Sequence, residues 1–129
     1  MKYISTRGKG EAISSSKAII KGIADDGGLY VPEYFPYLYD DLKKKMGLSY
    51  EEIAYEIIKV FFDDIEENEL RRVINKSYNG KFYIKEENNF LELYHGPTSA
   101  FKDAALLFLP QIMKAAKKKE NIKEEVVIL

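Results

Sequence analysis

The sequence predicts an α+β fold, mostly helical in its first seventy-odd residues and richer in strands afterwards. Two helices with recognisable capping residues, which begin at Ser49 and near Asp64, predict the helical part. Two short apolar runs on either side of a polar connection at 86–89 predict a β-hairpin in the second part. The 129 residues are enough for one compact domain and little more.

The N-terminal elements are short. Residues 2–5 alternate enough to form a strand, and residues 14–22 are typical of a capped helix that a glycine ends. Residues 25–28 (Asp-Asp-Gly-Gly) predict a turn, and residues 29–31 run extended into Pro32. Because proline donates no backbone hydrogen bond, this last run cannot be a central strand.

Residues 34–39 contain four aromatic side chains among polar neighbours. One interpretation is a small local cluster under a loop, since aromatic side chains tend to pack together. The other is a docking surface for a partner. The sequence favours the local cluster.

The two middle helices have apolar stripes at helical spacing. Ser49 and Glu52 form a capping box, and Asp64 with Glu67 resembles a second N-terminal cap. The stripes are typical of core residues: Ile53, Ile57, Ile58 and Phe61 in the first helix, and Leu70, Val73 and Ile74 in the second.

After Lys81 the pattern changes to strands. Residues 82–84 and 90–93 flank the hairpin connection, and a helix is expected from about 99 to 119, kinked or split at Pro110. Lys114 and Lys117 to Lys119 lie toward its C-terminus, where a solvated helix end explains them. Residues 125–129 (Glu-Val-Val-Ile-Leu) predict the opening of a buried strand. An apolar segment with no following turn indicates a chain cut inside a larger fold.

Lys102 is the strongest candidate for chemistry, because it stands where a loop rich in Gly and Pro becomes a helix. Thr98 or Ser99 is expected to cap that helix. The helix dipole disfavours an ammonium group at this position, and burial against Phe101, Leu106 and Leu107 would disfavour it further. A neutral amine is what Schiff-base formation requires.

Two other candidate chemistries are weaker. Ser99 and Lys102 have the S-x-x-K spacing of serine acyltransferases, but the required K-T-G element is absent and we reject this interpretation. His95 is the only histidine, so no histidine metal cluster forms, and a structural role is favoured. No metal site is expected.

Composition excludes several classes of protein. The formal net charge is −1, with no basic stripe among aromatics, which argues against nucleic-acid binding. Without cysteine there are no disulfides, thiolate metal sites or cysteine nucleophiles. No signal peptide and no apolar run of membrane-spanning length is present. We therefore expect a cytoplasmic protein.

Three segments, in the right order, resemble the threonine synthase family. Residues 92–103 (Glu-Leu-Tyr-His-Gly-Pro-Thr-Ser-Ala-Phe-Lys-Asp) are similar to the cofactor-lysine motif of that family, apart from Ser99, where leucine is common. Residues 3–8 (Tyr-Ile-Ser-Thr-Arg-Gly) and 22–32 (Gly-Ile-Ala-Asp-Asp-Gly-Gly-Leu-Tyr-Val-Pro) agree as well. The resemblance covers essentially the whole chain.

The resemblance implies an enzyme dependent on pyridoxal 5'-phosphate, with a fold like that of the tryptophan synthase β chain. It implies that O-phospho-L-homoserine and water become L-threonine and phosphate, and that Lys102 holds the cofactor as a Schiff base and then acts as general base. Residues 1–78 would be the mostly helical N-terminal domain, and residues 79–129 the truncated start of the α/β cofactor domain. Family members are several times longer, so this chain alone is expected to be inactive.

Two alternatives remain. The chain could be a non-catalytic binding module derived from that domain, or part of another lyase of the same fold group. The segments at 3–8 and 22–32 argue against the second alternative, since they resemble threonine synthases specifically.

Overall fold

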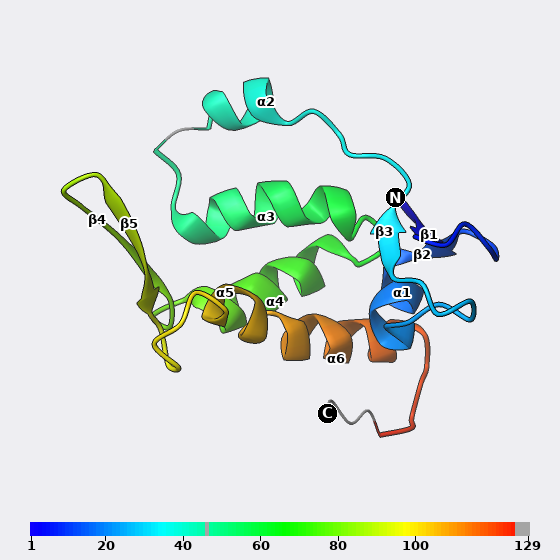
Figure 1. Cartoon of the computed structure of the whole chain (residues 1–129). Coiled ribbons are helices and arrows are strands. Elements are labelled where there is room, and N and C mark those ends of the chain that lie inside the picture. The colour runs from blue at the N-terminus through cyan, green and yellow to red at the C-terminus, as the bar shows by residue number, and fades with distance from the viewer. Residues whose placement is uncertain (46, 126–129) are drawn as a thin grey trace.

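A computed structural model describes residues 1–45 and 47–125 of the chain (Figure 1). It combines helices with two small antiparallel sheets, which confirms the α+β class. The elements follow in the order β1 (Lys2–Ser5), β2 (Ile13–Ser14), α1 (Ser15–Lys21), β3 (Tyr30–Pro32), α2 (Tyr39–Lys43), α3 (Tyr50–Phe61), α4 (Glu67–Tyr78), β4 (Tyr83–Glu87), β5 (Phe90–His95), α5 (Asp103–Leu106) and α6 (Leu109–Lys119).

The core is formed where α4 lies between α3 and α6, while α1 packs on α6 (Figure 1). Its most deeply buried apolar side chains come from α4 and α6, so residues distant in sequence share one interior. The cluster consists of Tyr55, Ile65, Leu70, Val73, Ile74, Tyr78, Phe82, Ile112 and Ala115. Ile112 has no exposed surface.

The N-terminal sheet has the strand order β2-β1-β3, with both neighbours antiparallel to β1. The strand at 2–5 is confirmed. Pro32 is the last residue of the edge strand β3, as its missing N–H requires. The two-residue strand β2 was not predicted, because so short a segment has no periodicity to recognise.

Helix capping is confirmed at two positions. Ser14 caps α1, and Gly22 with φ of 69° ends it. At α3 the Ser49 hydroxyl accepts from the Glu52 backbone N–H at 3.2 Å, and the Glu52 carboxylate accepts from the Ser49 N–H at 2.8 Å. These bonds satisfy donors that the first turn of a helix leaves without a partner.

The apolar stripe of α4 is buried as predicted, but that of α3 is not. Leu70, Val73 and Ile74 are each about 1% exposed. In α3 only Tyr55 is buried, and Ile58 is the member of the predicted stripe that packs against the core. Ile53, Ile57 and Phe61 are half-buried, because α3 lies at one side of the helical core and packs mainly on α4.

The second half of the chain follows the predicted pattern with shorter connections. The hairpin between β4 and β5 turns on Asn88 and Asn89 alone, whose φ angles of 51° and 65° are those of a tight hairpin turn. The four-residue connection at 86–89 is therefore wrong, since Glu86 and Glu87 pair with β5. The expected split is confirmed: α5 ends at Leu106, and Pro110 lies in the first turn of α6.

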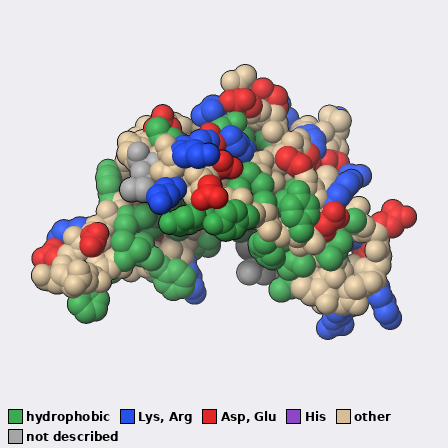
Figure 2. Space-filling model, turned by 90° about the horizontal axis from the view of Figure 1, so that it is seen from above, with side chains coloured by type: hydrophobic (Ala, Val, Ile, Leu, Met, Phe, Trp, Pro, Cys, Tyr) green, Lys and Arg blue, Asp and Glu red, His purple; other side chains and the backbone are tan. Residues whose placement is uncertain are grey.

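The aromatic segment lies at the surface. Tyr34, Phe35, Tyr37 and Tyr39 are between 57% and 76% exposed, so a buried cluster under a loop is wrong. The ring centroids of Phe35 and Phe61 are 6.5 Å apart, and those of Tyr37 and Tyr39 are 6.4 Å apart. Figure 2 shows hydrophobic side chains covering much of the face that carries α2 and α3. Helix α2 itself was not predicted.

Two further predictions concern the strand at the C-terminus and membrane-spanning helices. The strand expected at 125–129 falls, beyond Glu125, outside the described residues. Within the ranges 1–45 and 47–125, no helix has the length and apolar character needed to cross a membrane.

Candidate functional site

Lys102 lies directly before α5, with φ of −60° and ψ of −21°, where a loop becomes a helix as predicted. Its side chain is exposed, and Phe101 and Leu106 are 66% and 50% exposed. The expected burial of Lys102 is therefore wrong for this chain. The reason is the direction of α5, which turns Ala104 and Leu107 toward the core and leaves Lys102 on the opposite face.

Asp103, the next residue, is only 1% exposed. Its carboxylate accepts a hydrogen bond from the Thr98 backbone N–H at 2.9 Å and another from the Thr98 hydroxyl at 2.7 Å. Thr98 is therefore a donor to Asp103 and not a cap of the helix, and α5 has no side-chain cap at its N-terminus. The two bonds close the loop from 98 to 103 on itself.

Gly96 lies against the same carboxylate. A Cβ atom at this position would lie 2.4 Å from Asp103 Oδ2 and 2.9 Å from Asp103 Cβ, closer than non-bonded atoms approach. Ser99 adopts φ of 53°, and its N–H donates to the Gly96 carbonyl at 3.1 Å. The loop before Lys102 therefore requires glycine because the backbone passes so close to Asp103.

Tyr78 of α4 binds the backbone just after Lys102 and Asp103. Its hydroxyl donates to the Ala104 carbonyl at 2.9 Å, and its ring stacks on Phe108 with the centroids 6.3 Å apart. Burial raises the pKa of Tyr78 further above its ordinary value, which keeps the hydroxyl protonated well into the alkaline range. No sequence signal identified this residue.

The two weaker candidates, His95 and Ser99, make no hydrogen bond with Lys102 in the part of the chain that the structure describes. His95 Nε2 and Glu92 Oε2 are 2.6 Å apart, as expected of a hydrogen-bonded structural histidine. The pKa of Glu92 is lowered, most strongly by a hydrogen bond from Tyr94 and less by one from His95. Among the described residues, no hydrogen bond joins Ser99 to Lys102, and the serine interpretation gains no support.

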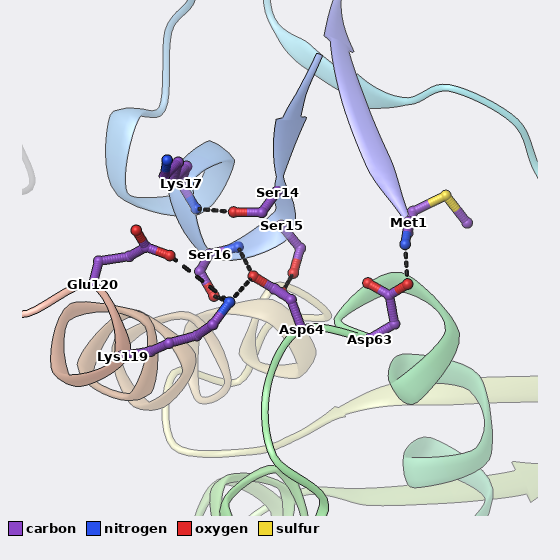
Figure 3. Close-up of polar contacts among 9 residues, drawn as sticks. All are labelled: Met1, Ser14, Ser15, Ser16, Lys17, Asp63, Asp64, Lys119 and Glu120. Carbon is purple, nitrogen blue, oxygen red and sulfur yellow. Dashed lines mark hydrogen bonds and ion pairs between the residues drawn. The ribbon is translucent and has the colours of Figure 1, made fainter.

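A second polar cluster lies at the far end of α6 (Figure 3). The Asp64 carboxylate accepts from the Ser15 hydroxyl, from the Ser16 N–H at 3.3 Å and from the Lys119 ammonium. The same ammonium donates to the Ser16 hydroxyl at 3.5 Å. Asp64 thus joins α1, α6 and the segment before α4.

Two predictions are corrected by this cluster. Asp64 is not the cap of α4; that role belongs to Glu66, whose carboxylate accepts from the Glu69 N–H at 3.1 Å. Lys119 is not merely a solvated helix end, because it pairs with a carboxylate 55 residues away in sequence.

The cluster makes stability depend on pH. Burial raises the pKa of Asp64, but hydrogen bonds from Lys119, Ser15 and Ser16 outweigh it and bring the pKa from 3.8 to about 2. A lowered pKa in the folded state adds stability above pH 4, which is lost as the pH falls toward 2. The shift corresponds to about 2 kcal/mol.

We expect Asp64→Asn to lower the free energy of unfolding at pH 7 by about that amount. Urea unfolding of both proteins at pH 7, 4 and 2.5 checks this, and the gap between them should shrink at the lowest pH. A gap independent of pH would contradict the assignment.

An apolar groove lies away from Lys102. Its volume is about 560 Å³, and it is lined mainly by α1, α6 and the end of α3, through residues such as Ile19, Phe62, Leu109 and Met113. Lys102 is not among its lining residues. Lys102 therefore lies on an exposed turn, and the residue that holds this turn, Asp103, is buried.

The chain is similar in sequence and in fold to known proteins. The family model described as "Threonine synthase N terminus" matches residues 2–78. Threonine synthases of Methylobacillus glycogenes and Pseudomonas aeruginosa are each 35% identical to the chain, which they cover to 88% and 100%. A crystal structure of threonine synthase with bound PLP, from Brucella melitensis, superposes on 94% of the chain with a TM-score of 0.83 and 33% identity.

The chain spans less than a third of the length of these relatives, 28% of both the Methylobacillus and the Brucella proteins. Because the superposition covers 94% of the chain, it extends well beyond residue 78, where the family match ends. From the family match, the sequence identity and the common fold, the chain belongs to the threonine synthase family and corresponds to its N-terminal part.

Proposed function

We propose that this chain is the N-terminal part of an enzyme that converts O-phospho-L-homoserine and water into L-threonine and phosphate. The cofactor is pyridoxal 5'-phosphate, and Lys102 is the residue that binds it covalently. The observation that carries the proposal is the position of Lys102 at a fixed turn in a chain of this family. The PLP in the Brucella relative supports the choice of cofactor.

The residues around Lys102 fit such a group. Lys102 is exposed, so its amine is accessible. The exposed Phe101 ring and Leu106 offer apolar surface beside it. Bound pyridoxal phosphate supplies an electron sink for a substrate carbanion. With the cofactor bound, the Lys102 amine would be the group of this chain that moves protons at the substrate carbons.

We also propose that the 129-residue chain alone neither binds the cofactor stably nor turns over substrate. A phosphate group needs several converging N–H donors or cations. The exposed turn at Lys102 provides no such enclosure among the described residues. A domain boundary after residue 78 is part of the same proposal, supported by the end of the family match at that position.

Reduction with borohydride tests the assignment. In the full-length enzyme, meaning this chain continued to the length of its relatives, we expect the cofactor to become fixed at Lys102, as peptide mass mapping would show. The 129-residue chain should give no stoichiometric adduct. An adduct on another lysine in the full-length enzyme would refute the assignment of Lys102, and a stoichiometric adduct on the short chain would refute its predicted inactivity.

A non-catalytic binding module remains the second candidate, favoured by the exposed aromatic side chains of residues 34–39. Turnover of O-phospho-L-homoserine by the full-length enzyme would decide against it. The cytoplasmic location stays a prediction from the sequence.

A further inference from the structure

We propose that Asp103 is a positioning residue, which sets the direction of the Lys102 side chain by locking the loop in front of it. This inference rests on the proposed function of Lys102. Under this inference the buried Asp103 carboxylate acts on Lys102 through the backbone and not by touching the substrate or the cofactor.

The first argument is burial. Asp103 is 1% exposed although its neighbour Lys102 is exposed, so consecutive side chains point to opposite sides of the turn. A carboxylate is seldom buried this fully unless hydrogen bonds compensate for the lost hydration. Here the compensation comes from Thr98, at 2.9 Å and 2.7 Å. The burial therefore has a specific partner.

The second argument is the closeness of the loop. Gly96 approaches the carboxylate so tightly that a methyl group would clash with it at 2.4 Å. The loop also turns through Ser99 at positive φ, a conformation that is unfavourable for serine without support. The support comes from the Ser99 N–H bond to the Gly96 carbonyl and from the two bonds that hold the preceding residue, Thr98, to Asp103.

The third argument is the position of Lys102 between two anchors. Asp103 ties the start of α5 back to Thr98, and the Tyr78 hydroxyl ties the Ala104 carbonyl to α4 at 2.9 Å. Lysine has a long, flexible side chain. The backbone must therefore fix the direction in which that side chain leaves the turn, because this limits the positions that the amine can reach. Misplacement of a reacting group by about 1 Å can cost on the order of a hundredfold in rate.

The test uses two substitutions of graded severity in the full-length enzyme. Asp103→Asn replaces an acceptor by an amide whose NH2 cannot accept from Thr98. Thr98→Val removes only the hydroxyl donor, and Thr98→Ser restores it. Asp64→Asn is the matched control, since it alters another largely buried, hydrogen-bonded aspartate at the far end of α6.

We expect Asp103→Asn to lower kcat by about 10- to 100-fold, with KM changed less than about threefold. Thr98→Val should lower kcat by a smaller factor, and Thr98→Ser should regain most of it. Asp64→Asn should lower thermal stability and leave kcat within about twofold. Amide hydrogen exchange, which does not depend on turnover, should become faster in residues 96–103 for Asp103→Asn and Thr98→Val only.

The outcomes separate the two proposals. If borohydride fixes the cofactor at Lys102 while Asp103→Asn and Thr98→Val keep the parent kcat, the positioning role is wrong and the proposed function stands. If the adduct forms elsewhere, the proposed function itself fails. Should Asp103→Asn not fold, the Thr98→Val and Thr98→Ser pair decides, and equal kcat values for these two would overturn the inference.

Discussion

Lys102→Ala in the full-length enzyme is expected to lower kcat by about a thousandfold or more. Loss of general acid–base catalysis alone typically costs 10²- to 10⁴-fold, and loss of the covalent anchor adds to it. The side chain is exposed in the described structure, so its removal should leave the fold intact. Steady-state kinetics with O-phospho-L-homoserine, together with a thermal melt, would measure both effects.

Two matched variants give this prediction its control. Lys102→Arg keeps the positive charge. Arginine does not form a Schiff base with an aldehyde at neutral pH, because its guanidinium stays protonated. It should therefore lose as much activity as the alanine variant. Lys114→Ala removes another exposed lysine, from α6, and should leave kcat unchanged. Full activity in Lys102→Ala would refute the proposed function.

Ile112→Ala is expected to give the largest loss of stability, about 2–5 kcal/mol, because it opens a cavity in a closed core. Ile112 has no exposed surface and belongs to the cluster that α4 and α6 share. Urea unfolding of the 129-residue chain, followed by circular dichroism, measures the change.

The control is Ile84→Ala in the hairpin, where the side chain is 45% exposed and the expected change is within about 0.5 kcal/mol. Equal losses in the two variants would contradict the described core. The shape of the unfolding curve adds information, since α4 precedes residue 79 and α6 follows it. A single transition would indicate that both segments unfold together.

Local sequence signals predicted the elements they control. The capping box of Ser49 and Glu52, the glycine that ends α1 and the split before Pro110 all depend on residues within one or two turns. Helix α2 was missed because Leu38 at its start offers no side-chain cap. Its five residues are too few for a periodic pattern.

Long-range partners explain the other errors. Asp64 was the cap expected from the sequence, because aspartate is a preferred N-cap residue. Its carboxylate instead binds Ser15 and Lys119, which lie 49 and 55 residues distant. The position of Lys102 at a helix start was predictable from Gly96 and Pro97. Its exposure was not, because burial depends on what packs over the turn.

Asp103 shows the same limit at the candidate site. The sequence places a carboxylate beside Lys102, but it does not show that the carboxylate is buried and bonded to Thr98. Burial is decided by the direction in which α5 meets the core, and that direction depends on Tyr78 and Phe108.

The pairing of α4 with α6 has a consequence for biosynthesis. When α4 leaves the ribosome, α3 is already available to pack on it, but Leu70, Val73 and Ile74 lack their partners from α6 until Ile112 and Ala115 have been translated. At about 5–20 residues per second, that delay lasts a few seconds. During this time the nascent polypeptide exposes part of an apolar helix face to solvent, which is the kind of segment that a chaperone binds.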